Sequence, residues 1–175
     1  INKVFAKIEQ INLNNKNDIY EYLNKKNIWY EITNHKAVYN MEELKEISFP
    51  YQNSDAKNLF ICDDKKQNYY LVVVKGDKKV NLKEFKQKYK TRSLSFASEK
   101  ELLDILGLVP GFVSPLGILN DNERKVTVYI DYTLTLDEGI IGVHSNDNTA
   151  TVWLKTIDLI RIIKEHGNFV KTIEI

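Results

Sequence analysis

Three short segments of this chain carry polar side chains that have little structural role on their own. They are Lys57-Asn58 at the head of an apolar run, the turn Gly111-Phe112-Val113-Ser114-Pro115, and His144 at the end of an apolar stretch. A lysine supplies a point charge for phosphate or carboxylate, an asparagine amide both donates and accepts, and a neutral histidine adds one donor and one acceptor. We therefore expect the three segments to form one ligand pocket.

The turn has its own chemical signature. Gly111 permits a positive φ, and Pro115 has no N–H to give to a strand. The backbone N–H groups between them, at Phe112, Val113 and Ser114, can therefore face outward and hold a carbonyl or carboxylate oxygen.

Other catalytic chemistries find less support in the residues. Ser114 lies in no G-x-S-x-G motif, and Cys62 follows a strand-like apolar run, so we expect Cys62 to be packed rather than reactive. His35, His144 and His166 show no metal-ligand spacing, which predicts no metal site, and His166 reads as a surface histidine near a helix C-terminus. Glycine-rich phosphate-binding motifs are missing, and we expect no cofactor.

The helices and strands that must position these residues can be predicted from apolar periodicity and from cap and turn residues. Helices are predicted over residues 18–26, 41–47, 82–89, 99–106 and 157–166, with Ser98 and Thr156 as caps of the last two. Strands are predicted over residues 28–32, 59–62, 69–74, 116–119, 125–132, 139–143, 149–154 and 170–175, the last at a sheet edge. Neighbouring strands flanked by helices indicate an α+β fold with a mixed, mostly antiparallel sheet.

Composition sets the broad class. The 175 residues are 43% hydrophobic and 28% charged, which is typical of one globular domain, here residues 1–175 with 1–14 as an N-terminal extension. No apolar stretch approaches the roughly 18 residues of a membrane span, so we expect no membrane partner. The single cysteine excludes an internal disulfide framework. Together these features predict a cytoplasmic protein.

The charge distribution leaves two readings open. A net charge of +1 is unlike that of a non-specific nucleic-acid binder. Basic side chains nevertheless gather locally, at Lys75, Lys78, Lys79, Lys83, Lys86, Lys88, Lys90 and Arg92. They form either a solvated helix face or a surface that follows RNA phosphates.

Four motifs, taken in order, resemble one known family. They read Asp55-Ala56-Lys57-Asn58-Leu59-Phe60, Ser95-Phe96-Ala97-Ser98-Glu99, Leu106 through Gly117, and Gly142-Val143-His144 through Asn148-Thr149-Ala150-Thr151. These motifs and their order resemble those of the YbaK and prolyl-tRNA synthetase-associated editing domains, particularly the ProX-type deacylases of Ala-tRNA(Pro). One difference is Ser145, where the family usually has a proline after the histidine.

The resemblance implies the family's curved-sheet fold and a hydrolase that removes mischarged alanine from tRNA(Pro). It assigns catalytic roles to Lys57 and His144, and substrate contacts to Asn58, to Gly111 through Pro115 and to Gly142. The implied partners are the aminoacylated end of tRNA(Pro) and the prolyl-tRNA synthetase. Two alternatives stay open: a Cys-tRNA(Pro) deacylase of the YbaK branch, and a non-catalytic tRNA-binding or synthetase-associated module.

Overall fold

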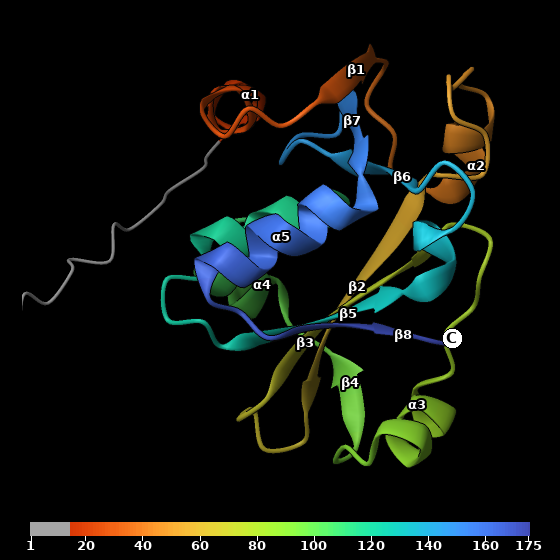
Figure 1. Ribbon diagram of the computed structural model, residues 1–175. Coiled ribbons are helices and arrows are strands. Elements are labelled where there is room, and N and C mark those ends of the chain that lie inside the picture. The colour runs from red at the N-terminus through yellow and green to blue at the C-terminus, as the bar shows by residue number, and fades with distance from the viewer. Residues whose placement is uncertain (1–14) are drawn as a thin grey trace, which may run out of the picture.

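The computed structural model describes residues 15–175, which form an α+β domain of two sheets flanked by helices (Figure 1). The predicted extension over residues 1–14 lies outside the described residues. The helices are α1 (Lys16–Lys25), α2 (Met41–Lys45), α3 (Leu82–Tyr89), α4 (Glu99–Leu106), α5 (Thr156–His166) and the short 3₁₀ helices η1 (Pro115–Asn120) and η2 (Tyr132–Thr135). The strands are β1 (Tyr30–Asn34), β2 (Ala56–Asp63), β3 (Tyr69–Lys75), β4 (Leu94–Phe96), β5 (Val126–Asp131), β6 (Ile140–His144), β7 (Ala150–Lys155) and β8 (Val170–Ile173).

The larger sheet has the strand order β4-β2-β3-β5-β8. The hairpin β2–β3 and the pair β2–β4 are antiparallel, whereas β5 pairs in parallel with both β3 and β8. Leu71, Val72, Val73 and Val74 of β3 are all fully buried. This confirms the prediction of a central strand covered on both faces, since a strand with two buried faces reads as a continuous apolar run.

The smaller sheet has the order β1-β7-β6, and both of its pairs are antiparallel. It meets the larger sheet where Asp55, just before β2, forms a parallel bridge with Gly142 of β6. The N–H of Gly142 donates to Ser54 O at 2.8 Å, which fixes this junction. The mixed, mostly antiparallel arrangement predicted from the sequence is confirmed, with the strands divided between two sheets.

Local signals explain the helix that leads into the glycine-proline turn. Ser98 caps α4 as the sequence predicted, and Glu101 accepts a hydrogen bond from the Ser98 N–H, which completes a capping box. Gly107 ends the helix with φ of +65°, and the turn at Gly111 follows four residues later. A helix with both ends defined therefore sets where the turn begins.

Two predictions of local structure are wrong, and one strand was missed. Residues 116–119 lie in η1 rather than in a strand, and Leu116, Ile118 and Leu119 are buried there. The short strand β4 was not predicted. Thr156 does not cap α5, because its hydroxyl donates to Leu134 O at 2.6 Å and Lys155 occupies the cap position without a side-chain bond.

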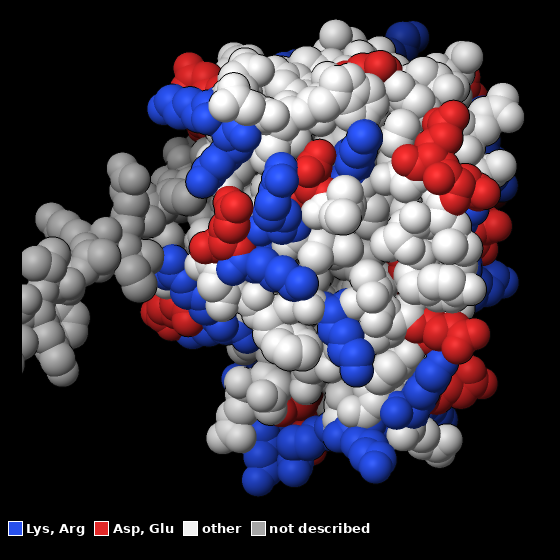
Figure 2. Space-filling view, viewed as in Figure 1, with Lys and Arg blue, Asp and Glu red and all other residues white. Residues whose placement is uncertain are grey.

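The charges are mixed over the face seen in Figure 2, where Lys and Arg side chains are interspersed with Asp and Glu. Among the helices of residues 15–175, none has the length and apolar character to cross a membrane.

Candidate active site

The glycine-proline turn lies between the two sheets and is bonded to both. Asn58 Nδ2 on β2 donates to Val113 O at 3.3 Å. Ser114 Oγ donates to the backbone O of His144 on β6 at 2.6 Å, and the Leu116 N–H donates to Ser114 Oγ at 3.2 Å. The structure therefore brings together Asn58, the turn and His144, as the sequence analysis expected.

The turn itself combines an exposed start with a buried end. Gly111 is exposed with φ of +87°, and a Cβ added there would lie 3.8 Å from the ring of Tyr39. Phe112 is half-buried and its N–H donates to Val109 O at 3.1 Å. Pro115 is buried and begins η1. The positive φ explains why a glycine stands at the first position.

His144 is held in its neutral form. Burial and, to a smaller extent, His35 lower the pKa of its imidazole to about 4, and Asp147 acts in the opposite direction. His35 Nε2 lies 2.9 Å from Thr151 Oγ1, and Thr151 pairs with His144 across β6 and β7. Sequence reasoning gave His35 no role here, because its neighbours in space come from residues more than a hundred positions away.

Two buried polar atoms at this site have no hydrogen-bond partner within the described residues. They are Asn58 Oδ1 and His144 Nδ1. Since the Asn58 amide already donates to Val113 O, its free oxygen can accept from an N–H or O–H of a ligand. A buried polar group left without a partner is costly, so these atoms mark where a polar ligand would be held.

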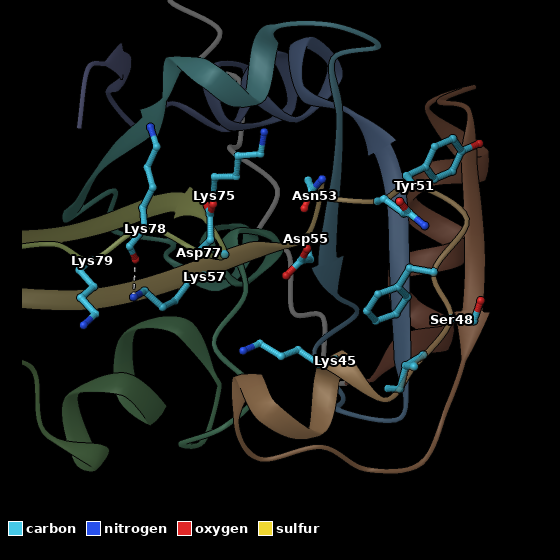
Figure 3. Close-up of a pocket in the computed structure, with 14 residues that line it drawn as sticks. Lys45, Ser48, Tyr51, Asn53, Asp55, Lys57, Lys75, Asp77, Lys78 and Lys79 are labelled. Atoms are coloured by element: carbon cyan, nitrogen blue, oxygen red, sulfur yellow. Dashed lines mark hydrogen bonds between the residues drawn. The ribbon is translucent and has the colours of Figure 1, made fainter.

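Lys57 points away from the turn, because successive side chains of a strand project to opposite faces. Its ammonium donates to Lys78 O at 2.7 Å, within a pocket of about 650 Å³ (Figure 3). Among the described residues that line this pocket, neither Asn58 nor His144 nor any residue of the turn is found.

Gly142 contributes to packing at the junction. A Cβ there would lie 2.4 Å from the indole of Trp153, which is fully buried. Only glycine leaves room for this ring, so the structure gives Gly142 a packing role, and its predicted contact with substrate stays a prediction.

The two side chains considered as nucleophiles, Cys62 and Ser114, are inaccessible or engaged. Cys62 is fully buried in β2, as expected, and the Ser114 hydroxyl is buried and bonded to backbone on both sides. The surface reading of His166 is wrong: the side chain is buried and its Nδ1 lies 2.7 Å from Asn168 Oδ1. Over residues 15–175, no three His, Cys, Asp or Glu side chains gather as a metal ion requires.

The basic side chains of residues 75–92 fall into two groups, which meet where Lys79 and Lys88 line one small pocket. Lys75, Lys78 and Lys79 line the lysine pocket. Farther along the chain, Lys86 donates to Ser93 Oγ and Arg92 pairs with Asp64. The cluster thus comprises a pocket lining and a group on and after α3, in which Lys86, Lys88 and Arg92 have partners on the protein.

Comparison with known proteins connects this geometry to a family. Residues 35–162 match the model of the aminoacyl-tRNA editing domain. The chain belongs to the aminoacyl-tRNA editing domain family. The resemblance of the four sequence motifs is thereby confirmed, and with it the expectation of an editing enzyme.

Individual editing-domain relatives cover almost the whole chain. The prolyl-tRNA editing protein ProX of Acetoanaerobium sticklandii is 39% identical over 98% of this chain and 95% of its own length. The prolyl-tRNA synthetase associated domain-containing protein 1 of Danio rerio is 32% identical over 86% of this chain and 82% of its own. A crystal structure of a proposed trans-editing enzyme for prolyl-tRNA synthetase shares the fold, with a TM-score of 0.68 over 91% of this chain and 96% of the other, at 16% identity.

Proposed function

We propose that this protein is a trans-acting hydrolase that removes alanine from mischarged Ala-tRNA(Pro), releasing alanine and intact tRNA. One observation carries the proposal: the glycine-proline turn is bonded between Asn58 and His144, and both of these side chains present an unpartnered buried atom. The similarity to the ProX protein over nearly the full chain supports the choice of tRNA(Pro).

The proposed reaction is addition of water to the ester carbonyl, followed by cleavage of the bond to the ribose oxygen, which takes up a proton. An aminoacyl ester is already activated, so orienting a water molecule or the neighbouring ribose hydroxyl is sufficient catalysis. Neutral His144 can hold that water or the terminal adenosine through its imidazole. The Phe112 N–H already donates to Val109 O. The N–H groups of Val113 and Ser114 in the turn can stabilise the oxyanion that forms.

Lys57 has the position of a phosphate-binding residue rather than of a group on the ester carbonyl. Its side chain projects from the face of β2 opposite to Asn58, whose amide contacts the turn. We assign the acyl group to the turn from Gly111 to Pro115, where a small pocket would reject proline by size, and the terminal phosphate to Lys57.

This function needs no cofactor and no protein nucleophile. It implies tRNA(Pro) as the partner, with the prolyl-tRNA synthetase as the enzyme whose errors are corrected, and it implies action in the cytoplasm. Because Cys62 is buried and the Ser114 hydroxyl is engaged, we expect no covalent aminoacyl adduct on either residue by mass spectrometry.

A deacylation panel over Ala-, Cys-, Ser- and Pro-tRNA(Pro) tests the proposal. We expect Ala-tRNA(Pro) to be hydrolysed fastest and Pro-tRNA(Pro) to be spared. A preference for Cys-tRNA(Pro) would instead indicate the YbaK branch. Failure to hydrolyse any of the four, with tRNA still bound, would establish a binding module and overturn the proposal. Asn58→Ala, which removes the free acceptor, should abolish most of the activity.

A further inference from the structure

The pocket around Lys57 is unusual in its charge. Five lysines line it, namely Lys45, Lys57, Lys75, Lys78 and Lys79, against two aspartates, Asp55 and Asp77. These lysines come from α2, from β2, from the end of β3 and from the turn that follows it. Like charges gathered in one concavity repel each other, and a bound anion would relieve that repulsion.

Most of these lysines have no carboxylate partner. Across residues 15–175, the ion pairs within 4 Å include Lys78 with the buried Asp131, but none involves Lys45, Lys57, Lys75 or Lys79. In Figure 3 the amines of Lys45, Lys57 and Lys79 lie on one side of the pocket, whereas Lys75 extends in another direction. Three cations are therefore available to one ligand.

Lys57 is oriented for this purpose. One of the three N–H groups of its ammonium donates to Lys78 O, and the other two can donate to the oxygens of an anion. The turn that carries Lys78 O is itself fixed, because Lys78 Nζ lies 2.7 Å from a carboxylate oxygen of Asp131, which is fully buried. A rigid backbone acceptor thus holds the central lysine in place.

We propose that this lysine pocket binds the phosphodiester backbone of the single-stranded tRNA 3′ end, upstream of the esterified adenosine. Lys57 would hold the phosphate next to that adenosine, and Lys45 and Lys79 the phosphates before it. The inference rests on the proposed function, because Asn58 of the acyl site follows Lys57 directly and their Cα atoms are only about 3.8 Å apart. A strand of RNA whose ester lies against the turn must pass the head of β2, where the pocket opens.

The test compares two substrates that differ in their phosphates. Ala-tRNA(Pro) has the full 3′ end, whereas the alanyl ester of adenosine has the same reacting bond and no phosphate. In the double variant Lys45→Ala/Lys79→Ala, kcat/KM for Ala-tRNA(Pro) should fall about 10- to 100-fold, and the salt dependence of log KM should weaken by about 1 to 1.5. Hydrolysis of alanyl-adenosine should be unchanged.

A matched control removes two lysines elsewhere. Lys25→Ala/Lys164→Ala has the same net charge, and its positions on α1 and α5 are exposed and lie away from α2 (Figure 1). This variant should behave as the wild type on both substrates. Equal losses in the two double variants, or equal losses of the pocket variant on both substrates, would overturn the inference.

Failure of the proposed function would be visible separately. In that case the wild-type protein hydrolyses neither substrate. Binding of an uncharged acceptor-stem RNA ending in CCA is then measured over the same salt series. This measurement tests whether the lysine pocket binds RNA, independently of any hydrolysis. Weaker binding by Lys45→Ala/Lys79→Ala with normal binding by the control supports the RNA site, and identical binding by both refutes it.

Discussion

Two consecutive residues of β2 face different parts of the candidate site. Asn58 turns toward the glycine-proline turn, and Lys57 turns into the lysine pocket. The alternation of side chains along a strand makes this division possible without any bend in the backbone. The pair that the sequence analysis placed in one pocket therefore lies on opposite faces of the strand.

Replacement of Lys57 tests the contact in the lysine pocket. Lys57→Ala should lower kcat/KM for Ala-tRNA(Pro) by roughly 10- to 1000-fold, because one charge-assisted contact to the substrate is lost. The free energy of unfolding should barely change, since the side chain is half-buried and its only recorded bond within the described residues is to Lys78 O. Deacylation kinetics and urea denaturation measure the two effects. Unchanged kinetics in the variant would remove Lys57 from the site.

The buried His144 predicts a dependence of stability on pH. The native imidazole has a pKa of about 4, below the ordinary value of 6.5 that it regains on unfolding. Between about pH 6.5 and pH 4 the unfolded state therefore binds a proton that the native state does not, and stability falls as the pH falls. Above pH 6.5 this contribution is complete and constant.

The measurement is urea denaturation at pH 7.5, 6, 5 and 4.5, on the wild type and on His144→Asn. The wild type should lose up to about 1.4 kcal/mol per pH unit more than the variant between pH 6.5 and 4. Parallel curves for the two proteins would show that His144 is not kept neutral by its surroundings.

At the scale of elements, the helices α4 and η1 on either side of the glycine-proline turn determine its position. Helix α4 ends at Gly107, and η1 begins at Pro115 with its first residues buried in the core. Hydrogen bonds from Asn58 and to His144 then fix the residues between. The turn is thus rigid although it makes no ladder of its own.

Gly111→Ala tests whether this turn forms the acyl site. With φ of +87°, an alanine would strain the backbone by roughly 1 to 2 kcal/mol and add a methyl group beside the acyl position. Gly167→Ala is a matched control, because Gly167 also has a positive φ of +106° and lies at the end of α5. Both variants should lose stability, whereas only Gly111→Ala should lose deacylase activity. Full activity in Gly111→Ala would place the acyl group elsewhere.

The elements that the sequence predicted well are those with local signals. α3 and α4 have the predicted bounds, because cap residues and apolar periodicity, which determine where a helix begins and ends, depend only on residues close together in the sequence. The buried 3₁₀ turn η1 was mistaken for a strand, since Leu116 to Leu119 form a short apolar run that periodicity cannot distinguish from one. The positions of His35 and His166 could not be predicted, because sheet pairing and the contact with Asn168 set them.

For the whole molecule, the meeting of the two sheets decides what the site can contain. β6 approaches the larger sheet at the bridge of Asp55 with Gly142, and the turn from Gly111 to Pro115 closes the space where the strands diverge. Residues from three distant parts of the sequence, namely Asn58, the turn and His144, thereby lie close together. Three of the four motifs contain these residues, but the motifs could not indicate the separation of Lys57 from the turn.

Asp131 connects the core of the larger sheet to this site. It is fully buried at the end of β5, where it accepts hydrogen bonds from the Lys75 N–H, the Thr133 N–H and hydroxyl, and Lys78 Nζ. Since Lys78 O holds Lys57, we expect Asp131 to act as a positioning residue for Lys57. Asp131→Asn should cost about 3 kcal/mol of stability, because it leaves the Lys78 ammonium without its partner.

A double-mutant cycle separates positioning from general destabilisation. If Asp131 acts through Lys57, Asp131→Asn should lower kcat/KM in the wild type but have little further effect in Lys57→Ala, because the group that it positions is already gone. Asp121→Asn is the control: Asp121 is equally buried and accepts from the Lys125 and Val126 N–H groups and from Asn168, at the other end of β5. The control should reduce stability with no coupling to Lys57. Additive losses of activity for Asp131→Asn and Lys57→Ala would show that the buried carboxylate supports the fold alone.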